Sequence, residues 1–140
     1  VAAMLRESLP QDASLVSIRS WPEFIGETSG YSYIKPKGEI AGARWGHAGS
    51  DATHMEDFHN PDGTMRSADD IAAMWKTWNI LPEQHVAFYC GTGWRASEAF
   101  MYARAMGWQN VAVYDGGWYE WSSHPQKPVS TGERGPESAR

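Results

Sequence analysis

The stretch from Val86 to Arg104, VAFYCGTGWRASEAFMYAR, constrains the fold and chemistry of this chain more than any other. A short apolar run, Val86 to Tyr89, leads to the only cysteine, Cys90, and a glycine-containing turn then joins it to a series of good helix formers. Short apolar runs bounded by turn signals are typical of buried strands, and the residues after this turn favour a helix. The predicted order is strand, thiol, tight loop and helix.

The loop after Cys90 is predicted to be an anion cradle. The first N–H groups of a helix have no partner within the helix, and the helix dipole places partial positive charge there. A thiolate just ahead of a helix is therefore stabilised relative to the thiol. We expect Gly91 and Gly93 to allow backbone angles closed to other residues, so that successive N–H groups point at the sulfur. Arg95 adds a permanent positive charge, which we expect at the rim.

Predicted strands and helices alternate along the chain. Strands are expected over residues 14–19, 39–45, 85–89 and 110–114, and helices over 21–25, 68–78, the residues after the Cys90 loop up to 106, and 118–122. This alternation indicates an α/β domain with a mainly parallel central sheet and helices on both faces. Sites in such sheets lie beyond the carboxyl ends of the strands, where Cys90 is placed.

The 140 residues fit one domain. We divide the chain into a lead-in segment at 1–12, a domain at 13–125 and a polar tail at 126–140, expected to be loosely attached or disordered. The segment 26–38 is predicted to be a long surface loop. Its Tyr and Lys side chains are candidates to cover the site, although such residues are more often solvated. They are Tyr31, Tyr33, Lys35 and Lys37.

Charge and composition exclude several classes of protein. A net charge of −5 argues against general binding to nucleic acid or to anionic membranes. No apolar run approaches the roughly 18 residues needed to cross a bilayer. Because the chain begins on Val1, we expect that it was processed or cut from a longer one, and the compartment stays open. A single cysteine excludes an internal disulfide, and a lone cysteine in a glycine loop is a candidate nucleophile.

The histidines do not form a metal-binding pattern. His47, His54 and His59 are scattered through an irregular segment, and one cysteine cannot supply the paired thiolates of structural zinc sites. We take these as surface histidines and expect no metal and no organic cofactor.

Two motifs resemble the rhodanese family of sulfurtransferases. They are the loop Cys90 to Arg95 (CGTGWR) and the segment Asn110 to Trp118 (NVAVYDGGW), followed by Glu120 and Trp121. Segments 15–19, 38–43 and 60–64 support the match, which covers residues 13–125 or so. The resemblance is to the catalytic C-terminal domain of multi-domain sulfurtransferases, and in particular to the last domain of a bacterial protein with three rhodanese domains. It implies a rhodanese-like α/β fold.

The resemblance also implies a reaction and a site. The family cysteine takes a sulfane sulfur from a donor such as thiosulfate or 3-mercaptopyruvate, holds it as a persulfide and passes it to cyanide or a thiol. Preceding rhodanese domains of the same protein are implied partners, and a periplasmic location follows if that multi-domain likeness holds, a cytoplasmic one otherwise. The implied nucleophile is Cys90, and the implied binding residues are Gly91, Thr92, Gly93, Trp94, Arg95 and Arg19.

Four positions depart from the family pattern or stay open. Ser17 stands where the family usually has an acid, and Glu39 where it usually has a histidine, so we expect altered local hydrogen bonding. The matching family arginine of Arg19 contacts the donor anion, but a pair with Glu23 or another local acid is the alternative. The start of the loop, Cys90 to Gly93, resembles the loops of mercaptopyruvate-type enzymes. Those loops usually end in a neutral residue, whereas this one ends in Arg95, so the identity of the sulfur donor stays open.

Other readings of the cysteine loop predict different chemistry. A protein tyrosine phosphatase uses Cys-x5-Arg, whereas Ala96 holds that sixth position here and the spacing is Cys-x4-Arg. The shorter loop makes a smaller ring of N–H groups, which suits one sulfur better than a tetrahedral phosphate, and arsenate reduction meets the same objection. An inactive rhodanese-like interaction module commonly loses the cysteine that this chain keeps. The simplest alternative is that Cys90 is a buried structural thiol with no catalytic role.

Overall fold

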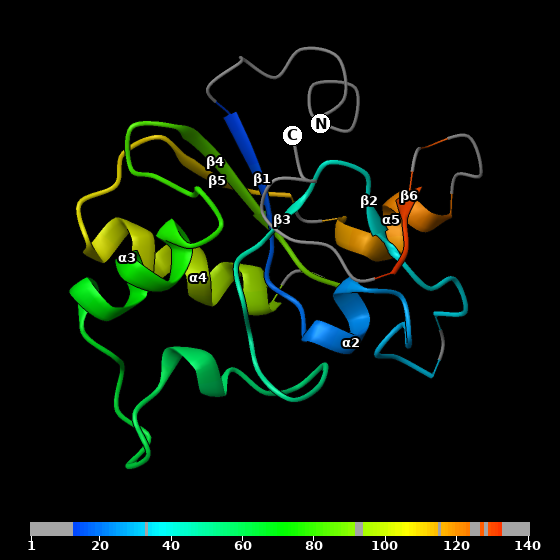
Figure 1. The fold of residues 1–140 in the computed structure, drawn as a ribbon, viewed down its shortest axis with the longest axis horizontal. Coiled ribbons are helices and arrows are strands. Elements are labelled where there is room, and N and C mark those ends of the chain that lie inside the picture. The colour runs from blue at the N-terminus through cyan, green and yellow to red at the C-terminus, as the bar shows by residue number, and fades with distance from the viewer. Residues whose placement is uncertain are drawn as a thin grey trace.

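A four-stranded parallel sheet forms the centre of the protein (Figure 1). The computed structural model describes residues 13–32, 34–91, 94–114, 116–123, 127 and 129–132. Its sheet has the order β3-β1-β4-β5, with every neighbouring pair parallel. The strands are β1 (Ala13–Ser17), β3 (Arg44–Trp45), β4 (His85–Tyr89) and β5 (Val111–Val113). The predicted α/β class with a mainly parallel sheet is confirmed.

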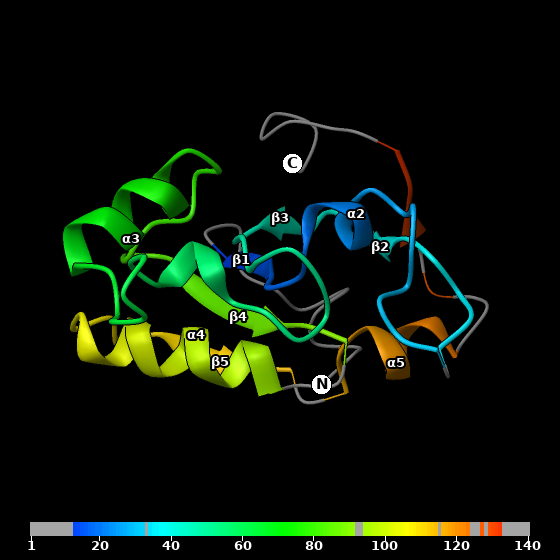
Figure 2. The same ribbon diagram turned by 90° about the horizontal axis from the view of Figure 1, so that it is seen from below.

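Alternating strand residues build a core on each face of the sheet. Val16 and Phe88 enter one buried cluster, whereas Leu15 and Tyr89, one residue along each strand, enter the other. Helices α3 (Ala68–Lys76) and α4 (Trp94–Ala105) contribute to the first cluster, and α5 (Gly117–Ser122) contributes to the second. Figures 1 and 2 show α3 and α4 to one side of the sheet and α5 with β2 (Glu39–Ile40) to the other. Helices therefore cover both faces, as predicted.

The helices begin and end where local signals place them. The Ser67 hydroxyl oxygen accepts a hydrogen bond from the Asp70 N–H at 3.1 Å and caps α3, whose Ile71 and Trp75 are buried. Helix α4 ends just ahead of Gly107. The remaining short elements are α2 (Trp21–Phe24) and the 3-10 turn η1 (Glu56–Phe58). None of the helices in the described part of the chain is long and apolar enough to cross a membrane.

Two expectations about the irregular regions were wrong. Residues 39–45 do not form one strand, because a turn with a 3.1 Å hydrogen bond from Ala43 N to Ile40 O separates β2 from β3. The tail is not entirely detached, since Val129–Ser130 forms β6 and pairs antiparallel with β2. The lead-in segment at 1–12 lies outside the described residues.

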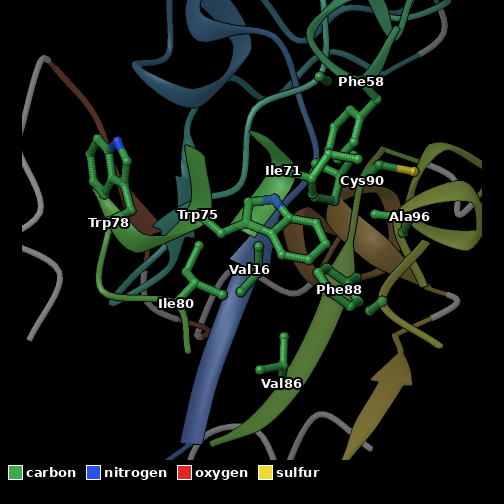
Figure 3. Close-up of a cluster of buried hydrophobic side chains, with 14 of the residues drawn as sticks. Val16, Phe58, Ile71, Trp75, Trp78, Ile80, Val86, Phe88, Cys90 and Ala96 are labelled. Carbon is green, nitrogen blue, oxygen red and sulfur yellow. The ribbon is translucent and has the colours of Figure 1, made fainter. Parts of the chain in front are cut away.

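Trp75 is the largest fully buried side chain of the main core. It is fully buried, its ring lies 5.3 Å from that of Phe88, and its indole N–H donates to Gly46 O at 3.0 Å (Figure 3). Trp94, by contrast, is 48% exposed. These two tryptophans offer a matched pair for testing which aromatic groups stabilise the fold.

We predict that Trp75→Ala lowers the free energy of unfolding by about 3 to 5 kcal/mol, because it leaves a large cavity and an unpaired carbonyl. Trp94→Ala should change it by no more than about 0.5 kcal/mol. Urea denaturation followed by circular dichroism measures both. Equal losses in the two variants would contradict this description of the core.

Candidate active site

Cys90 lies directly after β4, at the carboxyl end of a central strand. Its side chain is fully buried and belongs to the main core cluster, and Figure 3 shows it beside Ala96 at the edge of that cluster. Helix α4 begins at Trp94, a short loop after the thiol. The predicted order of strand, thiol, loop and helix is confirmed, although Thr92 and Gly93 lie outside the described residues.

The start of α5 fixes the backbone around the thiol. The Trp118 N–H donates to Cys90 O at 2.8 Å, and the Tyr119 N–H donates to Gly91 O at 3.0 Å. Gly117 makes this approach possible, since its φ is +55° and a Cβ there would collide with the Cys90 carbonyl oxygen. The first N–H groups of α5 therefore bind loop carbonyls, which positions the peptide that carries the thiol.

Gly91 is required for space rather than for an unusual backbone angle. Its φ is not in the left-handed region, contrary to our expectation. A Cβ atom at this position would instead collide with the ring of Tyr31 and lie 2.6 Å from its hydroxyl oxygen. Tyr31, from the long 26–38 loop, thus covers the site loop, as one reading of the sequence allowed. Lys35 and Lys37 are exposed.

The position that we expected for Arg95 was wrong. Its side chain is 0% exposed and does not lie at the rim. Nη1 donates to Glu23 Oε2 at 2.9 Å and Nη2 to Oε1 at 3.0 Å, while Nη2 also donates to the Tyr31 hydroxyl at 3.0 Å. Both terminal nitrogens therefore hold a carboxylate, and the guanidinium is buried instead of facing solvent.

Arg19 follows the alternative that we left open, because it pairs with local acids. It is fully buried, with Nε 3.4 Å from Glu23 Oε1 and Nη1 3.4 Å from Glu39 Oε2. Nη1 also donates to Gly38 O at 2.8 Å, and Nη2 to Ser29 O at 3.1 Å. Arg19 therefore connects the carboxyl end of β1 to two points, Ser29 and Gly38, of the loop that carries Tyr31.

Glu23 is the acid that connects the two arginines. Its carboxylate also accepts hydrogen bonds from the Ser20 N–H at 3.0 Å and the Ser20 hydroxyl at 2.7 Å. Burial alone raises the pKa of Glu23, but Arg95 and then Arg19 lower it below its ordinary value. Burial likewise disfavours charged Arg95, but the Glu23 carboxylate, with smaller contributions from Tyr31 and Cys90, raises the Arg95 pKa.

Ser17 and Glu39, the two residues that depart from the family pattern, bind each other. The Ser17 hydroxyl donates to Glu39 Oε2 at 2.6 Å, and the Tyr89 hydroxyl donates to Glu39 Oε1. Burial, followed by the nearby Glu39 charge, raises the Tyr89 pKa well above its ordinary value. The expected change in local hydrogen bonding is confirmed: the buried acid sits on β2 rather than on β1, and it holds the ring next to Cys90.

A cavity of about 430 Å³ opens beside Tyr31. Its described lining is rich in hydroxyl groups, and Asp51 is the one charged side chain among those residues. The hydroxyl-bearing residues are Ser20, Thr28, Tyr31, Ser32 and Ser50. A small molecule in this cavity would therefore contact Tyr31 and a set of hydroxyl groups.

The three central histidines each pair with a carboxylate. His47 Nδ1 lies 3.5 Å from Asp57 Oδ2, His54 Nδ1 lies 2.5 Å from Asp51 Oδ1, and His59 Nε2 lies 2.9 Å from Glu98 Oε2. Within the described ranges, no three His, Cys, Asp or Glu side chains gather in a way that could hold a metal ion.

Sequence reasoning gave Glu23 and Tyr31 too little weight. The pattern Ser20-x-x-Glu23 is a capping box and could have placed Glu23 at the start of a helix. No sequence signal could show that the same carboxylate also binds Arg95, which lies on α4. Asp115 and Tyr33 fall outside the described residues.

The fold and the cysteine loop together define a rhodanese domain, and comparison with known families agrees. The family model for the rhodanese-like domain matches residues 1–124, so the chain belongs to this family. The match includes the segment 1–12, which we had set apart as a lead-in.

Two known proteins are particularly similar to this chain. Thiosulfate sulfurtransferase YnjE of Escherichia coli (strain K12) is 87% identical over 130 residues, 93% of this chain and 30% of YnjE. A YnjE crystal structure superposes with a TM-score of 0.92 at 86% identity, over 94% of this chain and 32% of that one. The structure of an EanB variant with a cysteine persulfide and ergothioneine superposes with a TM-score of 0.87 at 52% identity. That match covers 94% of this chain and 30% of the EanB chain. YnjE is a bacterial thiosulfate sulfurtransferase, in agreement with the predicted resemblance, and this chain spans about a third of its length.

We predict that Glu23→Gln lowers the free energy of unfolding at neutral pH by about 3 to 5 kcal/mol, because it leaves buried arginines without their carboxylate. The Glu23 pKa is lowered on folding, so its contribution is complete above 4.5, its ordinary value, and is lost as pH falls through the folded-state value. The difference between wild type and variant should therefore narrow in acid. Urea unfolding at a series of pH values measures it, and a constant difference would refute the assigned ion pair.

Proposed function

We propose that this chain is a sulfurtransferase domain in which Cys90 carries the sulfur. In this proposal the Cys90 thiolate takes a sulfane sulfur from thiosulfate or 3-mercaptopyruvate, holds it as a persulfide and passes it to cyanide or a thiol. The observation that carries the proposal is the placement of Cys90 between the end of β4 and the start of α4, with its peptide held by α5. No cofactor is needed for either step.

In the proposed mechanism, backbone groups rather than arginine side chains bind the sulfur. We assign this role to the amides of Gly91, Thr92, Gly93, Trp94 and Arg95. Preorganised N–H donors of this kind contribute about 3 to 4 kcal/mol each to lowering a barrier. Arg95 and Arg19 are assigned to holding the loop and its cover, because their guanidinium groups are buried in ion pairs with Glu23 and Glu39.

The relatives support the same chemistry. YnjE bears the name thiosulfate sulfurtransferase, and EanB has been solved with a persulfide on a cysteine. Since this chain spans about a third of either relative, we propose only the cysteine chemistry for it. We further propose that neighbouring rhodanese domains of a longer protein help to form the donor cleft.

The structure disfavours the phosphatase reading. Phosphatase chemistry needs an arginine whose guanidinium can hold an oxyanion, whereas both terminal nitrogens of Arg95 bind Glu23. Ala96, at the position where that arginine would stand, is fully buried in the main core.

Incubation with thiosulfate or 3-mercaptopyruvate, followed by intact mass measurement, tests the proposal. We expect the wild-type chain to gain one sulfur atom and to lose it again when cyanide is added. Cys90→Ser should gain none, because its hydroxyl cannot form a persulfide. Failure of the wild-type chain to gain sulfur from any sulfane donor would refute the proposal, and turnover of an aryl phosphate would favour the phosphatase alternative.

A further inference from the structure

Cys90 must become accessible before it can react. Its side chain is fully buried, and a sulfur donor reacts only with a sulfur atom that it can touch. Part of the protein therefore has to move. The loop of residues 26–38 covers the neighbouring peptide, because its Tyr31 ring lies so close to Gly91 that no Cβ fits there. Movement of this loop is a route by which Cys90 can be exposed.

The two ends of the 26–38 loop lie against each other. A Cβ atom on Gly26 would lie 3.4 Å from the Cα atom of Gly38. Both glycines have φ angles in the left-handed region, +87° for Gly26 and +126° for Gly38, so a larger residue would be strained at either end. Loops whose ends meet in this way are compact units and often have a function. We call the contact between the two glycines the neck of the loop.

A short segment of the tail, residues 129–132, binds the chain on both sides of this neck. Just before the loop, the Ile25 carbonyl accepts a hydrogen bond of 2.6 Å from the Gly132 N–H. Just after the loop, β2 pairs with β6 and places Glu39 opposite Ser130 (Figure 1). The same four tail residues therefore connect the chain that enters the loop to the chain that leaves it.

Thr131 packs on the neck itself. Its Cγ2 methyl group lies 3.2 Å from the position that a Cβ atom would take on Gly26, and 3.2 Å from the same position on Gly38. The tail segment nevertheless lies at the surface, since residues 129, 131 and 132 are exposed and none of these four described residues belongs to a buried core cluster. Segments with few buried contacts open locally without unfolding the whole domain. The tail segment can therefore detach while both cores stay intact.

The two halves of the loop are held differently. Ile34 is buried in the second core cluster, and the Trp118 indole N–H donates to Pro36 O at 2.9 Å, so the second half is anchored on α5. The first half, residues 26–31, begins at the neck and carries Tyr31. We therefore expect the first half to move when the tail segment detaches.

We propose that residues 129–132 form a latch that keeps residues 26–31 closed over the cysteine loop, and that release of the latch exposes Cys90 to sulfur donors. Opening also breaks the hydrogen bond from Arg95 to the Tyr31 hydroxyl, so this bond and the latch together keep the loop closed. No covalent bond changes in the opening step, and its free energy sets how often the thiol is exposed. The inference rests on the proposed role of Cys90 as the sulfur carrier.

Gly132→Pro tests the latch in the full chain. Proline has no N–H to donate to Ile25 and cannot adopt the φ of +87° at Gly132. We expect Cys90 to react with iodoacetamide about 3 to 10 times faster than in the wild-type chain, a factor that corresponds to the loss of one hydrogen bond from the closed state. Single-turnover loading from dilute thiosulfate should rise by the same factor, because both reactions need the same exposed sulfur. Intact mass measurement follows both reactions.

Gly63→Pro is the matched control. Gly63 also has a φ of +87°, and its N–H donates to Asn60 O at 2.8 Å in a turn outside the loop. This variant should leave both rates unchanged. Thr131→Ala is a milder second test of the latch, because it removes the methyl group that packs on the neck. It should shift both rates in the same direction as Gly132→Pro.

A glutamate-specific protease locates the opening. Glu27, just after the neck, and Glu83, in the connection ahead of β4, are both exposed. In the two latch variants we expect faster cleavage after Glu27 and unchanged cleavage after Glu83, because the opening is confined to the loop. Mass measurement of the fragments distinguishes the two sites.

The outcomes separate the latch from the proposed function. An unchanged alkylation rate in both latch variants would overturn the inference, and so would faster cleavage at both glutamates, which would show general unfolding. Faster alkylation with slower sulfur loading would also overturn it, because the loop would then position the site instead of limiting access. A wild-type chain that is alkylated at Cys90 but gains no sulfur would refute the proposed function, and with it the role of the latch in sulfur transfer.

Discussion

The buried carboxylate of Glu23 is the interaction on which the site depends. It joins α2 to Arg19, just after β1, and to Arg95 at the start of α4. It also accepts a hydrogen bond from the Ser20 N–H. A single carboxylate could not balance two buried cations, and Glu39 supplies the second negative charge. The cluster is therefore neutral overall, as a low-dielectric interior requires. Removal of any member would leave a charge unpaired beneath the cysteine loop.

Because the ion-pair cluster is neutral, we assign it the role of positioning the site and assign the binding of sulfur to other groups. The arginine side chains are paired with acids, and in our proposal the loop amides and the start of α4 stabilise the anionic sulfur. The cluster acts on the reaction indirectly, through the peptides and the tyrosine that it positions. Arg95 is near enough to Cys90 that the thiol makes a small contribution to raising the Arg95 pKa, after that of Glu23.

The features that could be predicted from the sequence are those set by neighbouring residues: where single strands and helices begin and end. The apolar run before Cys90, the cap at Ser67 and the helix end at Gly107 act over a few residues, and all three were visible in the sequence. The partner of Arg95 was not visible in the sequence, because Glu23 lies far away along the chain and an arginine at the start of a helix is ordinarily solvent-exposed. The pairing of β6 with β2 was missed for the same reason, since two-residue strands carry no periodic signal.

Replacing the ion pair as a unit tests the central claim most directly. The double variant Glu23→Met with Arg95→Met removes both charges and keeps apolar volume, a change that folded proteins often tolerate. Sulfur loading of Cys90 would be measured with anionic thiosulfate and with an uncharged organic trisulfide. If Arg95 only positions the loop, the two loading rates should fall by the same factor. A selective loss of thiosulfate loading would show that Arg95 binds the donor anion and would contradict this account.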